Sequence, residues 1–257
     1  MEFRQKEMLE KYAELRKKYI DPYEPDLSEA PYTVRYAKIP DPCLSSDLCS
    51  HRVLQHFEAK KALFPRLYKK LPQGANAQEY AVLYFDRDDT LHHLEFQMDA
   101  ARRYLTVPLS GQLQADFEVR IWEEGRKPFV TFLSMEWTEY GADGNPVSVE
   151  SFRRNGSLAD GVIINSEYYQ YENGKMIHAD RFDSFDSDFQ IGGLVLRFVP
   201  DRIMNPEVFA YDFEPAEGGV LCTRTNYWSK SKTYTQSFLM PQKELQKMEE
   251  NGIRCFL

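Results

Sequence analysis

The chain has no long apolar run and only a few scattered cysteines. No stretch approaches the ~20 apolar residues that a membrane-spanning helix needs, and Met1 to Lys6 lead directly into charged residues, without the apolar segment of a secretory signal. With 257 residues, the chain can bury a core without disulfide bonds between its four cysteines. We therefore expect a protein that does not span a membrane and that works in the cytoplasm with reduced thiols.

The short motifs of familiar enzymes and cofactor sites are also missing. The sequence has no serine nucleophile elbow, no paired zinc motif and no dinucleotide-binding glycine fingerprint. Its closest approach to a metal motif runs from Cys43 to His51, and the spacing between Cys43 and Cys49 is wider than that of usual zinc knuckles. These absences predict no cofactor and no metal, and they favour a protein that is not an enzyme. A barrel-type enzyme can still assemble a site from residues far apart in sequence.

Negative charge is in excess, with a formal net charge of -8 at pH 7. Such a surface on average repels phosphate backbones and anionic lipid headgroups, so we do not expect nucleic acid as a partner. The same charge favours a basic protein partner. A modest acidic excess is also an ordinary means of staying soluble.

Aromatic residues and a period of two dominate the centre of the chain. Phe and Tyr number 17 and 16, and ring side chains suit the pleated surface of a sheet. From Tyr80 to about Leu239 apolar and polar positions alternate, as at Phe117, Val119 and Ile121, which is typical of half-buried strands. We predict ten or so antiparallel strands in a domain spanning 76–257, followed by a short helix over Pro241 to Asn251.

The N-terminal part has a helical period instead. Met8, Tyr12, Leu15 and Tyr19 recur at helical spacing and predict a helix over residues 1–20. Repeated prolines then predict an extended linker. A short strand over 32–39 and a second helix ending before Pro65 follow. We expect residues 1–75 to form a helical segment and linker that packs on the body.

Two hairpins with aromatic strands stand out. Trp137 to Phe152 contains the turn Asp143-Gly144, and Tyr168 to Phe182 contains Asn173-Gly174. Both dipeptides supply the positive φ angles that hairpin turns demand. These segments resemble bacterial tyrosine-aspartate hairpin repeats, and the resemblance implies a scaffold or interaction surface without a catalytic residue. Any antiparallel meander also places aromatics near its turns, so true repetition is one of two interpretations.

The number and order of the expected strands are similar, in topology alone, to lipocalin-like barrels. Such barrels have many antiparallel strands in chain order, short connections and a terminal helix, and closure removes the exposed sheet edges. The predicted fold class is mainly β with some helix. It is an antiparallel up-and-down meander that forms either a lipocalin-like barrel or a strongly curved sheet.

Aromatic and basic residues on the more polar strand face are the candidate ligand-binding residues. If the sheet closes, they line a cavity in which rings supply contact area and arginine orients an anionic group. If it stays open, they form ordinary cation–ring pairs. We predict a non-catalytic protein that binds a small apolar or amphipathic molecule through the following residues: Arg120, Trp122, Trp137, His178, Arg224 and Trp228.

Two alternatives remain open. The first is an acidic protein-interaction module, of immunity or scaffold type, whose hairpin face meets a basic partner. The second is an enzyme in the barrel mouth, because His178 and Asp180 could form a pair that moves a proton near neutral pH. Another histidine pair, His92-His93, is expected to point to opposite faces of a strand, so that at most one of them serves a site.

Overall fold

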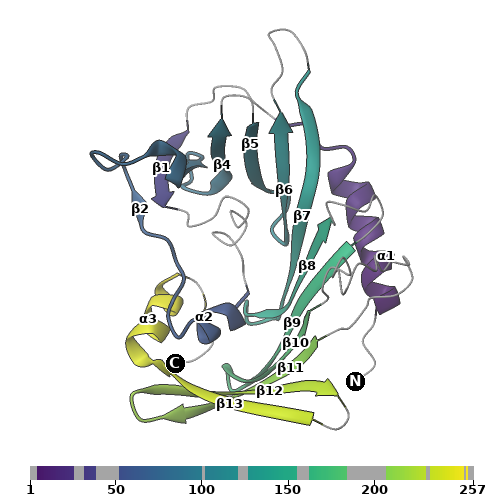
Figure 1. The fold of residues 1–257 in the computed structure, drawn as a ribbon, viewed down its shortest axis with the longest axis vertical. Coiled ribbons are helices and arrows are strands. Elements are labelled where there is room, and N and C mark those ends of the chain that lie inside the picture. Colours follow the sequence, from purple (N-terminus) through teal and green to yellow (C-terminus); the bar gives the residue numbers. More distant parts are fainter. Residues whose placement is uncertain are drawn as a thin grey trace, which may run out of the picture. The chain divides into compact units, whose positions relative to one another are not determined.

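Thirteen strands form one antiparallel sheet in the computed structural model, in which β3 to β13 follow one another as a meander and β1 lies between β3 and β2 (Figure 1). The structure describes residues 5–25, 32–38, 52–99, 102–120, 127–154, 162–183, 207–229, 232–251 and 253. In this part of the chain, the strand order ends at β2 on one side and at β13 on the other, and these two strands do not pair. The predicted meander and curved sheet are therefore confirmed, and the sheet is open instead of closing into a barrel.

The chain divides into two compact units. Unit 1 contains residues 1–50 and 65–136, and unit 2 contains residues 51–64 and 137–257. Segment 51–64 thus belongs to unit 2, although the chain on both sides of it belongs to unit 1. The predicted boundary near residue 75 is a different division of the chain, and it stays a prediction.

Unit 1 combines the N-terminal helix with the first strands. In helix α1, Met8, Tyr12 and Leu15 are buried as predicted, whereas the π-helical turn that follows buries Ile20 and leaves the predicted Tyr19 only partly buried. The predicted strand over 32–39 is also present, as β1. The elements of unit 1 are α1 (Gln5–Leu15), the π-helical turn η1 (Arg16–Ile20), β1 (Thr33–Lys38), β2 (Leu67–Tyr68), the 3-10 turn η3 (Ala77–Glu79), β3 (Tyr80–Phe85), β4 (Leu91–Asp99), β5 (Arg102–Pro108), β6 (Leu113–Arg120) and the first part of β7 (Phe129–Tyr140).

A bulge in unit 1 corrects one expectation about the histidines. Tyr84 pairs with His93, whereas Phe85 pairs with Leu91, so β4 has one extra residue at this point. The Nδ1 atoms of His92 and His93 consequently lie 2.8 Å apart. The prediction that the two rings point to opposite faces is wrong, because a bulge interrupts the alternation on which that argument depends.

Unit 2 contains the predicted hairpins and the C-terminal helix. Between β9 and β10, Asn173 and Gly174 have φ angles of 52° and 77°, the two positive values of a type I′ turn, which these residue types favour. The predicted helix ending before Pro65 is present in part as α2, and its earlier residues lie outside the described ones. The elements of unit 2 are α2 (Leu54–Glu58), the end of β7, β8 (Pro146–Arg154), β9 (Val162–Glu172), β10 (Lys175–Asp183), β11 (Glu207–Ala216), β12 (Gly219–Ser229), β13 (Lys232–Pro241) and α3 (Gln242–Glu250).

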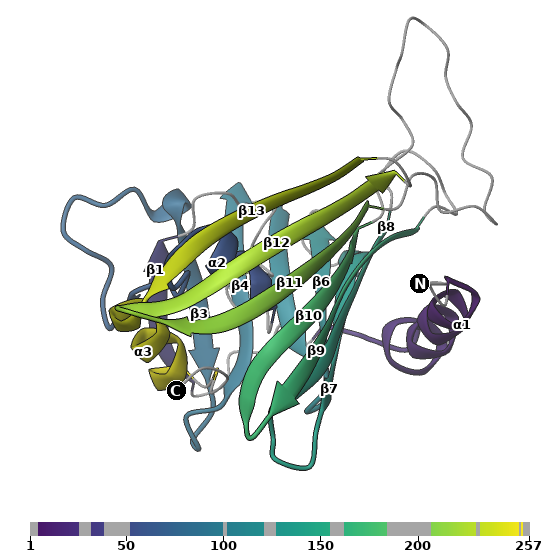
Figure 2. The same cartoon turned by 90° about the horizontal axis from the view of Figure 1, so that it is seen from below.

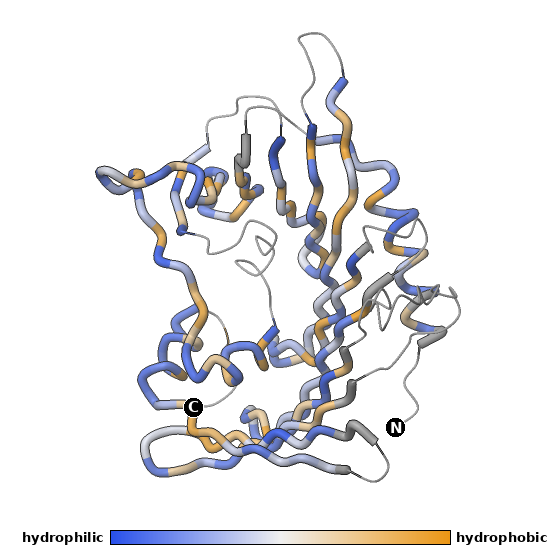
Figure 3. The backbone as a smooth tube through the Cα atoms, in the orientation of Figure 1, coloured by the Kyte–Doolittle hydropathy of each residue, from blue (hydrophilic) through white to orange (hydrophobic). Residues whose placement is uncertain are grey.

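The two faces of the unit 2 sheet differ in what covers them. Helices α2 and α3 lie together on one face of strands β9–β13, which we call the helix-covered face (Figures 1 and 2). Apolar and polar positions alternate along the strands (Figure 3). Tyr169, Ala179, Tyr211 and Phe238 thereby join α2 and α3 in one buried cluster. The other side of the sheet, which we call the second face, carries Tyr168 and other alternate residues.

Two further observations bear on the predictions made from composition. Among the helices that the structure describes, none is long and apolar enough to cross a membrane. Cys222 is a buried free thiol on the helix-covered face, and burial raises the pKa of this thiol. The other three cysteines lie outside the described residues.

Candidate functional site

Helix α2 is attached to the helix-covered face by apolar contact. It has only five residues, far fewer than a helix needs to persist alone in water, and no side chain caps it locally. Val53, Leu54 and Phe57 are completely buried against the sheet, and the ring centroids of Phe57 and Phe213 are 4.9 Å apart. The helix therefore depends on the sheet for its conformation.

Two side chains of β9 accept hydrogen bonds from backbone N–H groups at the N-terminus of α2. The backbone N–H of Leu54 donates to Glu167 Oε2 at 3.0 Å, and that of Val53 donates to the Tyr169 hydroxyl at 3.1 Å. The same hydroxyl donates to Glu167 at 2.5 Å. Burial, together with the charge of Glu167, raises the pKa of Tyr169. A carboxylate near the first N–H groups of a helix is favourable for both hydrogen bonding and charge.

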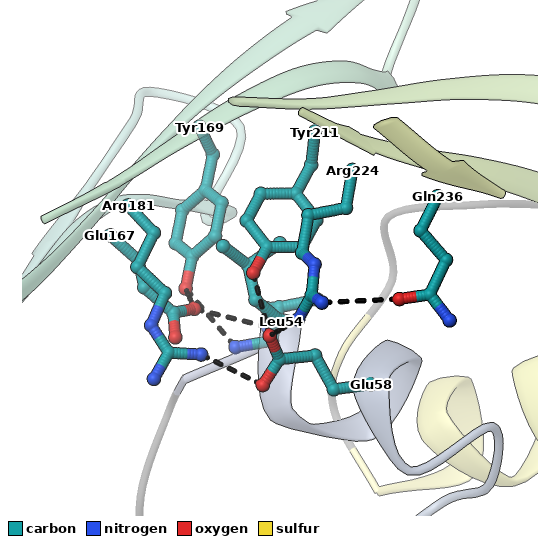
Figure 4. Close-up of polar contacts among 9 residues, drawn as sticks. Leu54, Glu58, Glu167, Tyr169, Arg181, Tyr211, Arg224 and Gln236 are labelled. Atoms are coloured by element: carbon teal, nitrogen blue, oxygen red, sulfur yellow. Dashed lines mark hydrogen bonds and ion pairs between the residues drawn. The ribbon is translucent and has the colours of Figure 1, made fainter. Parts of the chain in front are cut away.

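At the other end of α2, the Glu58 carboxylate meets two arginines and a tyrosine (Figure 4). Arg181 Nη1 lies 2.9 Å from it, Arg224 Nη1 3.1 Å and the Tyr211 hydroxyl 2.7 Å. Gln236 accepts a further hydrogen bond from Arg224. Burial alone would raise the pKa of Glu58, but the charge of Arg181 and the hydrogen bonds from Tyr211, Arg224 and Arg181 lower it below its usual value. Glu58 is thus held ionised as an anchor for α2.

His56 and the residues that follow it complete the attachment of segment 51–64. His56 is 2% exposed, its Nδ1 accepts the Leu63 N–H at 2.9 Å, and its ring stacks on Phe64. Within the described part of the chain, His56 Nε2 is buried without a hydrogen-bond partner. Burial lowers the pKa of His56 to about 4. From α3, Glu244 accepts the Ala62 N–H at 3.1 Å.

A pocket of about 330 Å³ lies near the β9–β10 turn and along the neighbouring strands. Its buried apolar walls come from Met176, Phe213 and Val220, and Ile177 is 40% exposed. The complete lining is Glu172, Asn173, Lys175, Met176, Ile177, Phe213, Glu214, Pro215 and Val220. Apolar walls with a few polar groups are typical of sites for small molecules.

The second face carries the predicted His178–Asp180 pair. Asp180 Oδ1 lies 3.4 Å from His178 Nε2, and Asp212 Oδ1, from the neighbouring strand β11, lies 2.7 Å from Nδ1. A neutral imidazole has one N–H and can donate to only one of these carboxylates. Because each ring nitrogen faces a carboxylate, His178 can take a proton from a substrate only after one contact opens. This geometry favours a structural cross-strand contact over general-base catalysis.

The structure distributes the predicted ligand-binding residues over several places. Arg224 pairs in register with Tyr211 and His178 with Asp212, so Arg224 and His178 lie on opposite faces of the sheet. Arg120, in unit 1, contacts Glu118 at 2.8 Å. These residues do not form one cluster, and their ligand-binding role stays a prediction.

The three tryptophans are the remaining predicted ligand-binding residues. The indole N–H of Trp137 donates to Glu139 at 3.3 Å, and Trp137 does not line the pocket. Trp122 lies outside the described residues, and so does the side chain of Trp228.

Sequence reasoning missed Glu58 and Arg181, which with Arg224 form the ion pairs that hold α2. Glu58 is separated from them by 123 and 166 residues, and its position in a short helix is typical of a solvent-exposed acid. Alternation places Arg181 and Arg224 on one face of the sheet, and this was the only available signal. The pocket was also missed, because its lining comes from turn residues and from a bulge at Ile177.

Neither the described residues nor comparison with known proteins adds a further pointer to function. The described residues contain no group of three His, Cys, Asp or Glu side chains that could hold a metal ion. Comparison with models of protein families, with curated proteins and with solved structures found no match. Function must therefore be argued from the geometry of this chain alone.

Proposed function

We propose that the protein is a non-catalytic binding protein of the cytoplasm, and that unit 2 holds a small, partly apolar molecule in the pocket beside the β9–β10 turn. The observation that carries this proposal is the pocket itself. Its volume of about 330 Å³ lies within the range of small-molecule sites, and several apolar side chains line it, of which Ile177 is 40% exposed. The resemblances to lipocalin-like barrels and to hairpin repeats are compatible with this proposal, but they do not test it.

The charges at the pocket indicate which polar group the ligand carries. Glu172 and Glu214 contribute two carboxylates, and Lys175 contributes one ammonium group. A cationic or hydrogen-bond-donating head group would find two acidic partners, whereas an anionic head group would find one basic partner. The pocket therefore favours an amphipathic molecule with a cationic head and an apolar tail.

The arginine site on the helix-covered face is a weaker candidate for the same ligand. Glu58 already occupies it, and a competing anion would have to displace α2 and expose Val53, Leu54 and Phe57, which are completely buried. Exposing each of these side chains costs about 1.5–3 kcal/mol. The total of at least about 4.5 kcal/mol would weaken binding by more than about a thousandfold. The pocket needs no such displacement.

Calorimetry with two probes of equal chain length tests this proposal. Octyltrimethylammonium, kept below its micelle concentration, should bind the protein and shift the methyl resonances of Met176 and Ile177, and octyl sulfate should bind more weakly. Ile177→Ser should weaken octyltrimethylammonium binding by about tenfold, because it removes apolar contact area. Leu67→Ser is the matched control, since Leu67 is similarly exposed at 42% but lies in unit 1.

Two results would overturn the proposal. The first is that neither probe binds at millimolar concentration. The second is that Ile177→Ser and Leu67→Ser weaken binding equally, because binding would then take place outside the pocket.

A further inference from the structure

The two edge strands of the sheet are built in opposite ways. At one end, β2 consists of only Leu67 and Tyr68, with Pro65 before it and Lys69 and Lys70 after it. A very short strand flanked by proline and lysine is a common protection against pairing with another chain. At the other end, β13 has ten residues. The two edges therefore differ in how much strand lies between the residues that protect against pairing.

The usual protective residues of an edge strand stand only at the two ends of β13, at Lys232 and Pro241. From Thr233 to Met240 it contains no charged residue and no proline, although 28% of the whole chain is charged. Residues 233–237 are all exposed, so this half of the strand is uncovered on both faces. Tyr234 is 66% exposed, the highest value among the exposed large hydrophobic residues of the described chain.

The backbone of β13 offers a continuous row of hydrogen-bonding groups. Its pairing with β12 is regular from Asn226↔Tyr234 to Val220↔Met240. In such a ladder, alternate residues direct their N–H and C=O groups away from the paired strand. Among the described elements, no strand lies beyond β13 (Figure 2). These outward groups therefore form a template for one more antiparallel strand.

We propose that β13 pairs through its outer edge with β13 of a second copy of this chain, so that the two sheets join antiparallel about a two-fold axis. In a two-fold antiparallel interface residue i of one copy pairs with residue j of the other and j with i, so a charged residue near the middle of the strand comes close to its own copy. Between Thr233 and Met240 the strand has none. The same lack of charge gives a basic or acidic partner nothing on this strand to recognise.

The net charge gives this pairing a salt dependence that distinguishes it from other partners. Two copies that each carry a charge of -8 repel each other at long range, and salt screens this repulsion. Self-association should therefore strengthen as salt increases. Binding of a basic protein would weaken under the same conditions.

Sedimentation equilibrium of the full chain tests the proposal. As the protein concentration rises from about 10 to about 500 μM, a range suited to a dissociation constant between micromolar and millimolar, the wild type should shift from monomer to dimer. In higher salt the shift should occur at a lower protein concentration. Thr235→Lys should weaken dimerisation by about tenfold or more, because two-fold pairing counts each new charge twice. Ser237→Lys should act in the same way and is the second variant, in case Thr235→Lys does not fold.

Gln246→Lys supplies the control, because it makes the same change of charge at an exposed position of α3 and should leave dimerisation unchanged. A wild type that stays monomeric at every concentration would overturn the proposal, even if another protein captured this edge. Equal effects of the folded edge variants and of Gln246→Lys would overturn it too, because the dimer would then use another surface.

Discussion

Both faces of the unit 2 sheet carry a group of contacts between carboxylates and basic side chains, but the two groups hold different parts of the chain together. On the helix-covered face, Glu58 contacts Arg181 and Arg224 and fixes a segment from a distant part of the chain. On the second face, His178 contacts Asp180 and Asp212 on its own and a neighbouring strand. The side chains of the first group are 20–30% exposed. In the second group His178 and Asp180 are 25% and 15% exposed, and Asp212, which makes the shorter contact, is 57% exposed. Charge pairs shielded from water interact more strongly than exposed ones. The comparison teaches that the contribution of such a group to stability depends on how far the surrounding structure shields it from water.

The largest expected effect comes from removing the apolar contact that provides this cover. Phe57→Ala should lower the free energy of unfolding by about 3–5 kcal/mol, the usual cost of truncating a buried phenylalanine. Urea denaturation measures this change, and hydrogen exchange should show faster exchange within residues 52–64. Phe129→Ala is the control, because Phe129 is 57% exposed, and it should cost less than about 0.5 kcal/mol. Equal losses in the two variants would show that α2 does not depend on its apolar anchor.

Acidification should produce the second largest effect on the helix-covered face. The pKa of His56 is lowered from 6.5 to about 4 in the folded protein, so between these values the unfolded chain binds more protons. The stability associated with neutral His56 is therefore complete above pH 6.5 and is lost as the pH falls toward 4. The loss should reach about 3 kcal/mol.

The non-titrating variant His56→Gln separates this effect from that of the carboxylates, which also titrate in acid. Urea denaturation at several pH values between 7 and 4 gives the stability of each protein. The wild type should lose about 3 kcal/mol more than the variant across this range. Parallel pH profiles for the two proteins would contradict the assignment to His56.

A matched pair of neutralising substitutions gives the smallest and most direct comparison of the two faces. Glu58→Gln should destabilise the protein by about 1–2 kcal/mol, because it leaves two partly buried arginines without their counter-ion. Asp212→Asn should cost less than about 0.5 kcal/mol, as expected for an exposed pair. Thermal and urea denaturation of both variants test this order. A larger cost for Asp212→Asn would reverse the proposed roles of the two faces.

Much of the fold could be predicted from local patterns. The helical spacing of Met8, Tyr12 and Leu15 indicated the first helix, the alternation after Tyr80 indicated the strands, and Asn173-Gly174 indicated a tight hairpin turn. These features depend on neighbours in the sequence. Closure of the sheet could not be predicted in the same way, because it depends on whether β2 and β13 meet, and neither local propensity nor alternation specifies that contact.

The candidate site was less accessible to sequence reasoning. Alternation singled out Arg224 as a residue that would orient an anionic group of a ligand, which stays a prediction; in the structure Arg224 contacts the chain's own Glu58, which lies 166 residues away. The argument from alternation failed at two other points, because a bulge interrupts the strand there. One bulge places His92 beside His93, and another shifts the register at Ile177, a residue of the pocket. A single inserted residue reverses the face to which every following side chain is assigned.

The membership of segment 51–64 in unit 2 has a consequence for any attempt to cut the protein into parts. The chain passes between the two units three times, after residues 50, 64 and 136, so no single break in the backbone separates them. A fragment that begins at Trp137 keeps Arg181, Arg224 and Tyr211 but loses the carboxylate and the apolar helix that cover them. Such a fragment would need residues 51–64 returned to it as a separate peptide.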